Sequence, residues 1–184
     1  MSDPSGRLSG MKIFTRFRIL NAARALVSEV GVERVTMRKI ARLANITAPA
    51  IYKHFANKRA LLDEVIASGF EEMGDGMLRG LRVSPGSEGL KIMTDAAVEF
   101  ALLYPNLTKM MLAPQTRDDQ PVRILEMQVD RCMRERVMRP RNPGHVAAFL
   151  WSQVRGVLSR RHDPPQLRPS FDWSMGEVLR PFAA

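Results

Sequence analysis

The sequence predicts an all-α fold in which an N-terminal three-helix domain containing a helix-turn-helix is followed by a larger helical domain. Apolar residues recur at intervals of three and four through most of the chain, which is the spacing of one helix face. Proline and cap residues stand where such stretches begin, and no stretch alternates apolar and polar residues as a half-buried strand does. A chain of 184 residues that is 45% hydrophobic can bury one good core, or the cores of a small and a larger domain.

The helix-turn-helix is predicted from the stretch TMRKIARLANITAPAIYKHFANK, residues 36–58. Two short helices are expected, over residues 37–44 and 48–55, and each has one apolar edge and one edge suited to a nucleic acid. The apolar edge of the first helix is formed by Met37, Ile40, Leu43 and Ala44. Its opposite edge carries Arg38, Lys39 and Arg42. The two apolar edges can therefore pack together while the basic edge stays outside.

Residues that begin and end helices stand at the expected places in this stretch. Thr36 and Thr47 each precede a helix, where a hydroxyl can accept a hydrogen bond from a free amide. Pro49 falls in the first turn of the second helix, where a missing N–H is tolerated. Asn45 lies between the helices and tolerates the left-handed backbone that a tight turn needs.

The stretch GVERVTMRKIARLANITAPAIYKHFANKRALLD resembles the N-terminal DNA-binding domain of the TetR (tetracycline-repressor-like) family of transcriptional regulators, over about residues 17–63. Asn45 stands where the family usually has Gly, which affects only the geometry of the turn. The residues that match the family pattern are Thr36, Ile40, Ala41, Tyr52, His54, Phe55, Asn57, Lys58 and Leu61. The resemblance implies a homodimeric regulator, most often a repressor released from a palindromic operator by a small ligand.

Geometry and resemblance together assign contacts to double-stranded DNA. Arg38 is expected to contact a base or a phosphate, because an arginine can bind guanine O6 and N7 with two hydrogen bonds. The residues expected to face the groove are Thr47, Ala48, Pro49, Ala50 and Lys53. Phosphate contacts are expected from Tyr52, His54 and Lys58. A packed aromatic ring is the alternative for Tyr52, and a structural role is the alternative for His54.

The positive charge of the chain lies in its N-terminal part. Residues 1–60 hold twelve Lys and Arg against three acids, whereas residues 61–184 hold sixteen of each. A basic run is often only a solvated face, but one that carries the whole surplus and a helix-turn-helix is expected to neutralise phosphates. Residues 1–14 are expected to form a mobile basic arm, either reaching DNA or without a role, before a first helix over residues 15–30.

Residues 1–56 are therefore expected to form the basic arm and DNA-binding domain, and residues 57–184 an all-helical ligand-binding and dimerisation domain. A fourth helix begins at Lys58 after the cap Asn57. Further helices are expected over residues 87–104, from 105, over 121–139, from 143 and near 170–182. Gly69, Gly74, Gly76 and Gly80 indicate either a soft connector, which we favour, or close helix packing.

The segments YPNLTKMML and FLWSQVRGVLS are similar to segments of TetR-family C-terminal domains, which implies a ligand pocket among these helices. The many methionines of this part can equally be core filling. The residues expected near a pocket for an apolar or aromatic effector are Phe100, Met110, Met111, Met127, Trp151 and Val154. Arg155 could face an anionic ligand or form an interface salt bridge.

A homodimer is expected for a physical reason as well as from the resemblance. Each good base contact contributes about 1–3 kcal/mol, so one recognition helix offers too little to select one genomic site. Two copies spaced near one DNA turn read a palindrome. The family implies that the last two long helices, residues 143–161 and 170–182, make this interface, with Leu150, Val157, Leu158, Val178, Leu179 and Phe182 in it.

The sequence disfavours an enzyme, and we expect no cofactor and no metal. His54, His145 and His162 share no metal-ligand spacing, Cys132 has no nearby His, and neither a Gly-rich phosphate loop nor a Ser-centred elbow occurs. The opening MSDPSGRLSG has no apolar signal core, and no run approaches the roughly 18 apolar residues of a membrane span. A cytoplasmic protein without membrane contact is expected. The alternative function is a basic, helical architectural protein that binds nucleic acid without ligand control.

Overall fold

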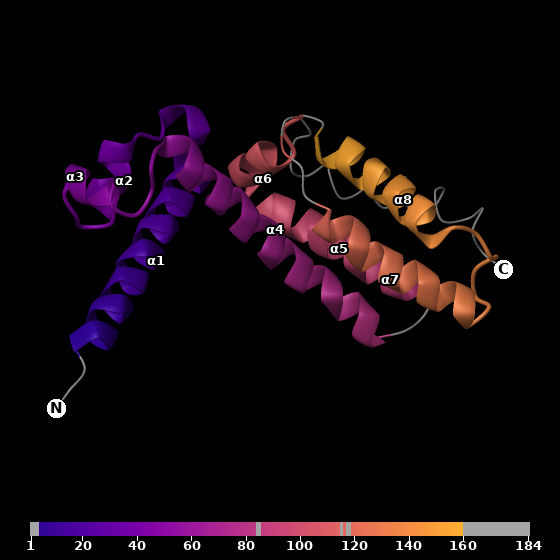
Figure 1. The fold of residues 1–184 in the computed structure, drawn as a ribbon. Helices are drawn as coiled ribbons and strands as arrows, with labels where there is room; N and C mark the ends of the chain where they lie inside the picture. The colour runs from indigo at the N-terminus through magenta and orange to yellow at the C-terminus, as the bar shows by residue number, and fades with distance from the viewer. Residues whose placement is uncertain (1–3, 84–85, 115, 117–118, 160–184) are drawn as a thin grey trace. The chain divides into compact units, whose positions relative to one another are not determined.

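A computed structural model describes residues 4–83, 86–114, 116 and 119–159, and shows the predicted all-α fold (Figure 1). The elements are α1 (Pro4–Val30), a 3-10 helix η1 (Val32–Arg34), α2 (Met37–Leu43), α3 (Ala48–Ile51), α4 (Lys58–Val83), α5 (Ser87–Leu103), α6 (Pro105–Met111), α7 (Gln120–Arg134) and α8 (Pro143–Leu158). The chain forms two compact units, Met1–Ser68 and Gly69–Ala184. The division falls inside α4, later than the boundary between residues 56 and 57 expected from the sequence. Among the described residues, no helix is both long and apolar enough to cross a membrane.

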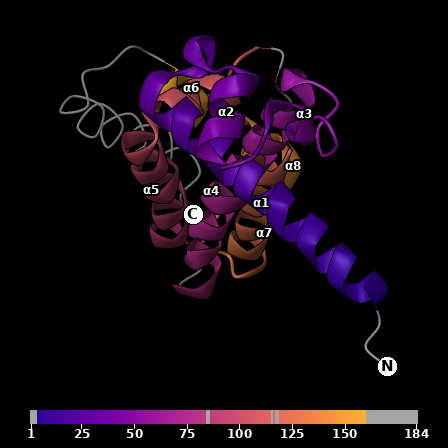
Figure 2. The same cartoon turned by 90° about the vertical axis from the view of Figure 1, so that its left-hand side faces the viewer.

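Helix α1 is longer than the sequence predicts. It begins at Pro4, where a mobile arm was expected, and its N-terminal turns extend past α2 and α3 (Figures 1 and 2). The expected arm is therefore wrong for residues 4–14, because α1 contains no proline after Pro4 and a helix nucleated by the packed part of α1 can propagate backwards. As predicted, α1 ends at Gly31, which has φ 76° and donates its N–H to Val27 O at 3.0 Å.

The core of the first unit is built by the apolar stripe of α1 and by single residues of the short helices. Ile19, Ala23 and Val27 of α1 are fully buried, as are Ile40 of α2 and Ile51 of α3. Phe55, Leu61 and Val65 complete this core from the segment that leads into α4. The helix-turn-helix is thus held from behind by α1 and by the beginning of α4, and its outer edge is left open.

Helix α4 continues through its glycines, which the structure uses for close packing and not as a soft connector. A Cβ built on Gly80 would lie 2.5 Å from Gly89 O and 2.5 Å from Met93 Cγ. A Cβ on Gly69 would lie 2.6 Å from Met111 Sδ. The favoured connector interpretation was wrong, because periodicity along one helix does not show how closely a neighbouring helix approaches it.

In the second unit, α5, α6, α7 and α8 surround a core rich in methionine, and α7 runs along α8 (Figure 1). Helix α7 ends at Arg134, earlier than predicted. Arg136 adopts φ 60°, and the N–H of Val137 donates to Cys132 O at 3.0 Å, so a left-handed residue closes the helix without glycine. Helix α8 begins as predicted, with the His145 N–H donating to Asn142 Oδ1 at 3.0 Å. The helix predicted near residues 170–182 lies outside the described residues.

Candidate nucleic-acid interface

The turn between α2 and α3 has the geometry that the sequence predicts. The hydroxyl of Thr36 accepts a hydrogen bond from the Lys39 N–H at 3.3 Å and caps α2. Asn45 has φ 52°, and the Ile46 N–H donates to Ala41 O at 3.0 Å. The Asn45 N–H also donates to Arg42 O at 3.1 Å. The two hydrogen bonds form a Schellman motif, which ends a helix with a residue in the left-handed conformation.

The conformation of Asn45 predicts a stability difference between two substitutions. Asn45→Val should lower the free energy of unfolding by roughly 1–2 kcal/mol, because a β-branched residue is disfavoured at positive φ. Asn45→Gly should keep or raise it, since glycine adopts this conformation without strain. Urea unfolding followed by circular dichroism measures both variants. Equal stabilities would show that the turn does not need a left-handed residue.

The recognition segment differs from its prediction in two details. Helix α3 ends at Ile51 instead of extending to Phe55, because His54 N–H donates to Ile51 O at 3.0 Å in a tighter turn. The predicted side-chain cap at Thr47 is wrong: its hydroxyl makes no cap hydrogen bond, and only its carbonyl is used, by the Ala50 N–H at 3.0 Å. The exposed Thr47 hydroxyl is thereby left for another partner.

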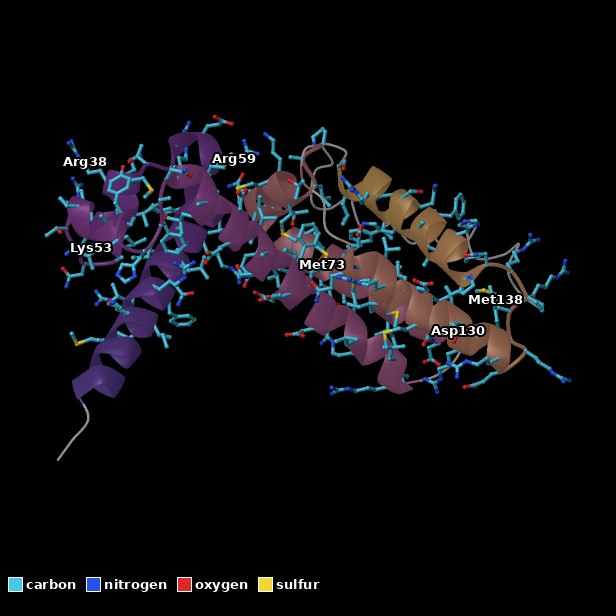
Figure 3. All side chains as sticks on the ribbon, in the orientation of Figure 1. Arg38, Lys53, Arg59, Met73, Asp130 and Met138 are labelled. Carbon is cyan, nitrogen blue, oxygen red and sulfur yellow. The ribbon has the colours of Figure 1, made fainter. Side chains whose placement is uncertain are left out.

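The residues expected to contact DNA are at the surface of the first unit. Figure 3 shows Arg38 and Lys53 at the same end of this unit, beside α2 and α3. Tyr52 is 55% exposed, which is compatible both with a phosphate contact and with an aromatic ring packed at the edge of the domain. The exposed positions of the set are Arg38, Thr47, Pro49, Tyr52 and Lys53, and the partly exposed ones are Ala48, Ala50, His54 and Lys58. The structure therefore places these basic, polar and small side chains on one open surface.

The basic side chains of this surface differ in what they already bind. The side chains of Arg38, Arg42 and Lys53 make no hydrogen bond or ion pair within the described residues, so their charges are available to a partner. In contrast, Lys58 Nζ donates to Val32 O at 3.2 Å, and Lys39 Nζ donates to Arg34 O at 3.0 Å. An ammonium has three donors, so these two lysines hold the loop before α2 and retain capacity for a phosphate.

Two arginines of α1 have roles that the sequence does not predict. By sequence, Arg16 and Arg18 belong to the basic region that could reach DNA. In the structure, Arg18 donates to the carbonyls of Ala44 and Asn45, and Arg16 donates to the carbonyl of His54. To predict these hydrogen bonds, one would need to know which residues of α1 lie beside the turn between α2 and α3. That placement is set by the tertiary structure.

The six residues expected near a ligand pocket do not all lie together. Five of them are buried in the second unit, with exposures of 0–9%: Phe100, Met110, Met111, Trp151 and Val154. Met127 is 55% exposed on the outer face of α7, so it does not lie with the other five. Arg155 donates to Leu112 O at 3.3 Å, which makes it a cap for the end of α6. This hydrogen bond differs from both roles that the sequence suggests for Arg155.

The residues expected in the dimer interface are also placed differently from one another. Leu150 is fully buried within its own chain, whereas Val157 and Leu158 are partly exposed. Val178, Leu179 and Phe182 lie outside the described residues. The exposed face of α8 is formed instead by Ala148, Phe149, Ser152 and Gly156. Helical spacing alone could not show which of the two faces of α8 packs against α7.

Two observations on the described residues concern metal binding and the single cysteine. Within the residues that it describes, no group of three His, Cys, Asp or Glu side chains could hold a metal ion. Cys132 is buried and accepts a hydrogen bond from the Gly86 N–H at 3.0 Å. Burial raises the pKa of the Cys132 thiol, which disfavours the reactive thiolate. The open basic surface is therefore the main candidate for function.

A comparison with known protein families matches the part of the chain that carries this surface. The family of bacterial regulatory proteins described as the tetR family matches residues 19–65, which include all of α2, the turn and α3. Residues 19–65 therefore form a domain of the TetR family. Members of this family are regulators and not enzymes, in agreement with the prediction from sequence.

Similar proteins include some that match only this domain and others that match most of the chain. The tetracycline repressor protein class A of Escherichia coli is 51% identical over 45 residues, 24% of this chain, and the match spans about a fifth of the repressor's length (21%). The nucleoid occlusion factor SlmA of Photobacterium profundum is 28% identical over 79% of this chain and 82% of its own. A TetR-family transcriptional regulator from Pectobacterium atrosepticum has the same fold, with a TM-score of 0.82, 21% identity and coverage of 95% and 97%.

Proposed function

We propose that this TetR-family chain is a homodimeric, sequence-specific transcriptional regulator that binds a palindromic operator and is released by a small apolar or aromatic ligand. The observation that carries the DNA-binding part is the exposed basic edge of the helix-turn-helix, where the side chains of Arg38 and Lys53 have no hydrogen-bond or ion-pair partner within the described residues. An open arginine and lysine beside a short helix can bind base edges and phosphates. The net positive charge of residues 1–60 supports the same function.

The residues of the helix-turn-helix are proposed to divide between sequence reading and positioning. Arg38 reads a base, and the small side chains of Ala48, Pro49 and Ala50 allow α3 to approach the groove closely, where a methyl group of thymine can pack. Thr47 and Lys53 also face the groove. The residues proposed to bind phosphates are Tyr52, His54 and Lys58. For Lys58, the hydrogen bond to Val32 O orients the ammonium without using all of its donors.

The two kinds of contact predict different effects of substitution. Arg38→Ala should relax the preference at one base-pair position, by about 1–3 kcal/mol of discrimination. Lys58→Ala should weaken all duplexes alike and lower the salt dependence of binding by about one counterion. Fluorescence anisotropy over a salt series measures both. An unchanged salt slope in Lys58→Ala would assign this lysine to the loop before α2 alone.

A dimer is proposed to form through the exposed face of α8, not through its buried side. Ala148, Ser152 and Gly156 lie one helical turn apart on this face, and a Cβ built on Gly156 meets nothing within 4 Å. Small residues on a helix surface let a second helix approach closely, and Phe149 adds a large apolar side chain that is 45% exposed. We propose a second copy of the chain as the occupant, because the operator is read by two recognition segments.

The ligand is proposed to bind among the buried residues of the second unit, which come from the C-terminal part of α4 and from α5, α6, α7 and α8. Methionines supply adaptable apolar walls there, and Met73, Met93 and Met111 are almost completely buried. The Thr108 hydroxyl is also buried, and it has no hydrogen-bond partner within the described residues. A ligand that supplied a partner would remove the penalty of this unsatisfied group. By favouring a dimer whose recognition segments are wrongly spaced, it would release DNA in proportion to its differential affinity for that state.

Enrichment of bound DNA from a pool of random duplexes tests the proposal directly. A palindrome with half-sites about one helical turn apart is expected, because a two-fold dimer presents two identical reading segments. The recovered duplex then serves to screen small molecules for release. Failure to enrich any sequence would contradict sequence-specific regulation.

A second candidate is a DNA-binding protein that works without a small effector. The relative named nucleoid occlusion factor SlmA matches most of this chain, which favours keeping this alternative. A gel shift comparing the enriched duplex with random duplex separates two cases. Equal affinity would support an architectural protein, whereas a strong preference that no compound changes would support an effector-free regulator.

A further inference from the structure

The last turn of α2 is closed by a side chain from α1. Arg18 donates one hydrogen bond to the carbonyl of Ala44, the C-cap of α2, and a longer one of 3.4 Å to Asn45 O. The carbonyls at the end of a helix have no intrahelical donors, and a cation there is favoured by the helix dipole. Arg18 therefore holds the turn at the point where the chain leaves α2 for α3.

A second arginine of α1 holds the other end of the recognition segment. Arg16 donates to the His54 carbonyl at 2.5 Å, forms an ion pair with Glu64 of α4, and lies over the Phe55 ring with its Cζ 4.2 Å from the ring centroid. These three contacts join α1, the turn after α3 and the beginning of α4. Arg16 and Arg18 thus bracket residues 46–53, which contain all of α3.

Helix α3 has few other means of keeping its orientation. It consists of the four residues Ala48–Ile51, its N-cap Thr47 makes no side-chain hydrogen bond, and Ile51 is the one buried residue within it. A helix this short is not stable by its own hydrogen bonds. Its direction must therefore be set by groups that hold its two ends. By contrast, α1 is anchored by the fully buried Ile19, Ala23 and Val27, so it is a rigid support for both arginines.

We propose that Arg16 and Arg18 are positioning residues that set the angle at which α3 meets DNA, and that their charges are used within the protein instead of on phosphates. This inference rests on the proposed sequence-specific binding. An error of about 1 Å in the placement of a recognition element misaligns hydrogen bonds to base edges, whereas contacts to a uniform phosphate backbone tolerate it. Removal of either arginine should therefore weaken specific binding more than non-specific binding.

The test measures binding of the full chain to the enriched duplex and to a scrambled duplex over a salt series. The variants are Arg16→Ala and Arg18→Ala, and Lys12→Ala is the matched control. Lys12 is an exposed basic residue of the same helix, and its side chain has no hydrogen bond or ion pair to the helix-turn-helix within the described residues. For each arginine we expect the ratio of specific to non-specific affinity to fall about tenfold relative to the control, the equivalent of one mismatched base pair.

The salt slope separates positioning from phosphate binding. Removing one cation that binds a phosphate of duplex DNA lowers the slope by about 0.9. With positioning, the slope of each arginine variant should equal that of wild type, and binding to the scrambled duplex should stay within twofold of Lys12→Ala. A slope lowered by about 0.9 with equal weakening on both duplexes would overturn the inference. An unchanged ratio of specific to non-specific affinity would also overturn the inference.

A second variant keeps the test decisive if an arginine substitution impairs folding. Glu64→Gln removes the ion-pair partner of Arg16 but leaves the arginine in place. If Arg16 positions α3, the affinity ratio should fall here too. If Arg16 instead binds a phosphate, its release from Glu64 should strengthen binding to both duplexes alike. A wild-type chain that did not distinguish the two duplexes would count against the proposed function itself.

Discussion

Gly156→Arg is expected to convert the proposed dimer to a monomer and to lower the affinity for the enriched DNA by about three orders of magnitude. The reason is that a monomer makes only half of the base contacts, at about 1–3 kcal/mol each. Gly156 lies on the exposed face of α8, where nothing approaches within 4 Å of an added Cβ. An arginine there fits the single chain and removes a glycine from a helix, so the fold should be kept. In a two-fold interface the arginine of one chain lies close to the same arginine of the second chain, and the bulk and like charge of the two side chains oppose association.

Sedimentation analysis measures the mass, which should fall from twice 20.8 kDa to 20.8 kDa. Leu103→Arg is the control, since it adds the same charge to the second unit at a position that is 72% exposed on α5. This control should remain dimeric and bind DNA as wild type does. A Gly156→Arg chain that stayed dimeric would place the interface on another face of the molecule.

Gly80→Ala is expected to produce the largest drop in stability from a single added methyl group. The new Cβ would lie 2.5 Å from Gly89 O and from Met93 Cγ, closer than real Cβ atoms come to their neighbours. Since the carbonyl belongs to the backbone of α5, it can yield only if the two helices separate. Overpacking of this kind outweighs the gain in helix propensity, and the free energy of unfolding should fall by about 2 kcal/mol.

Gly76→Ala, one turn earlier on α4, is the matched control for Gly80→Ala. Its added Cβ meets the Ala96 Cβ at 3.3 Å, where a small adjustment suffices. The change in the free energy of unfolding should stay within about 1 kcal/mol, because propensity and crowding oppose each other. Denaturant unfolding followed by tryptophan fluorescence reports both, since Trp151 lies in the same unit. Equal effects of the two substitutions would contradict the close approach of α4 and α5.

Local chemistry explains which features could be predicted from the sequence. Thr36 caps α2, Asn45 takes a positive φ, and Gly31 ends α1, because each of these depends on neighbouring residues only. The same holds for Asn57, whose Oδ1 accepts from the Ala60 N–H at 2.9 Å at the beginning of α4. The open basic edge of the helix-turn-helix follows from helical periodicity and from charge, which are also properties of the sequence.

The sequence by itself therefore determined the all-α class, the helix-turn-helix and its basic surface. The tertiary structure alone decided that Arg16 and Arg18 bind backbone carbonyls of the helix-turn-helix, and that Gly80 lies against the backbone of a second helix. It also decided that Leu150 faces its own core while Gly156 faces outward. The physical reason is that a helix presents several faces, and only packing against a distant segment selects which of them is buried, bonded or free.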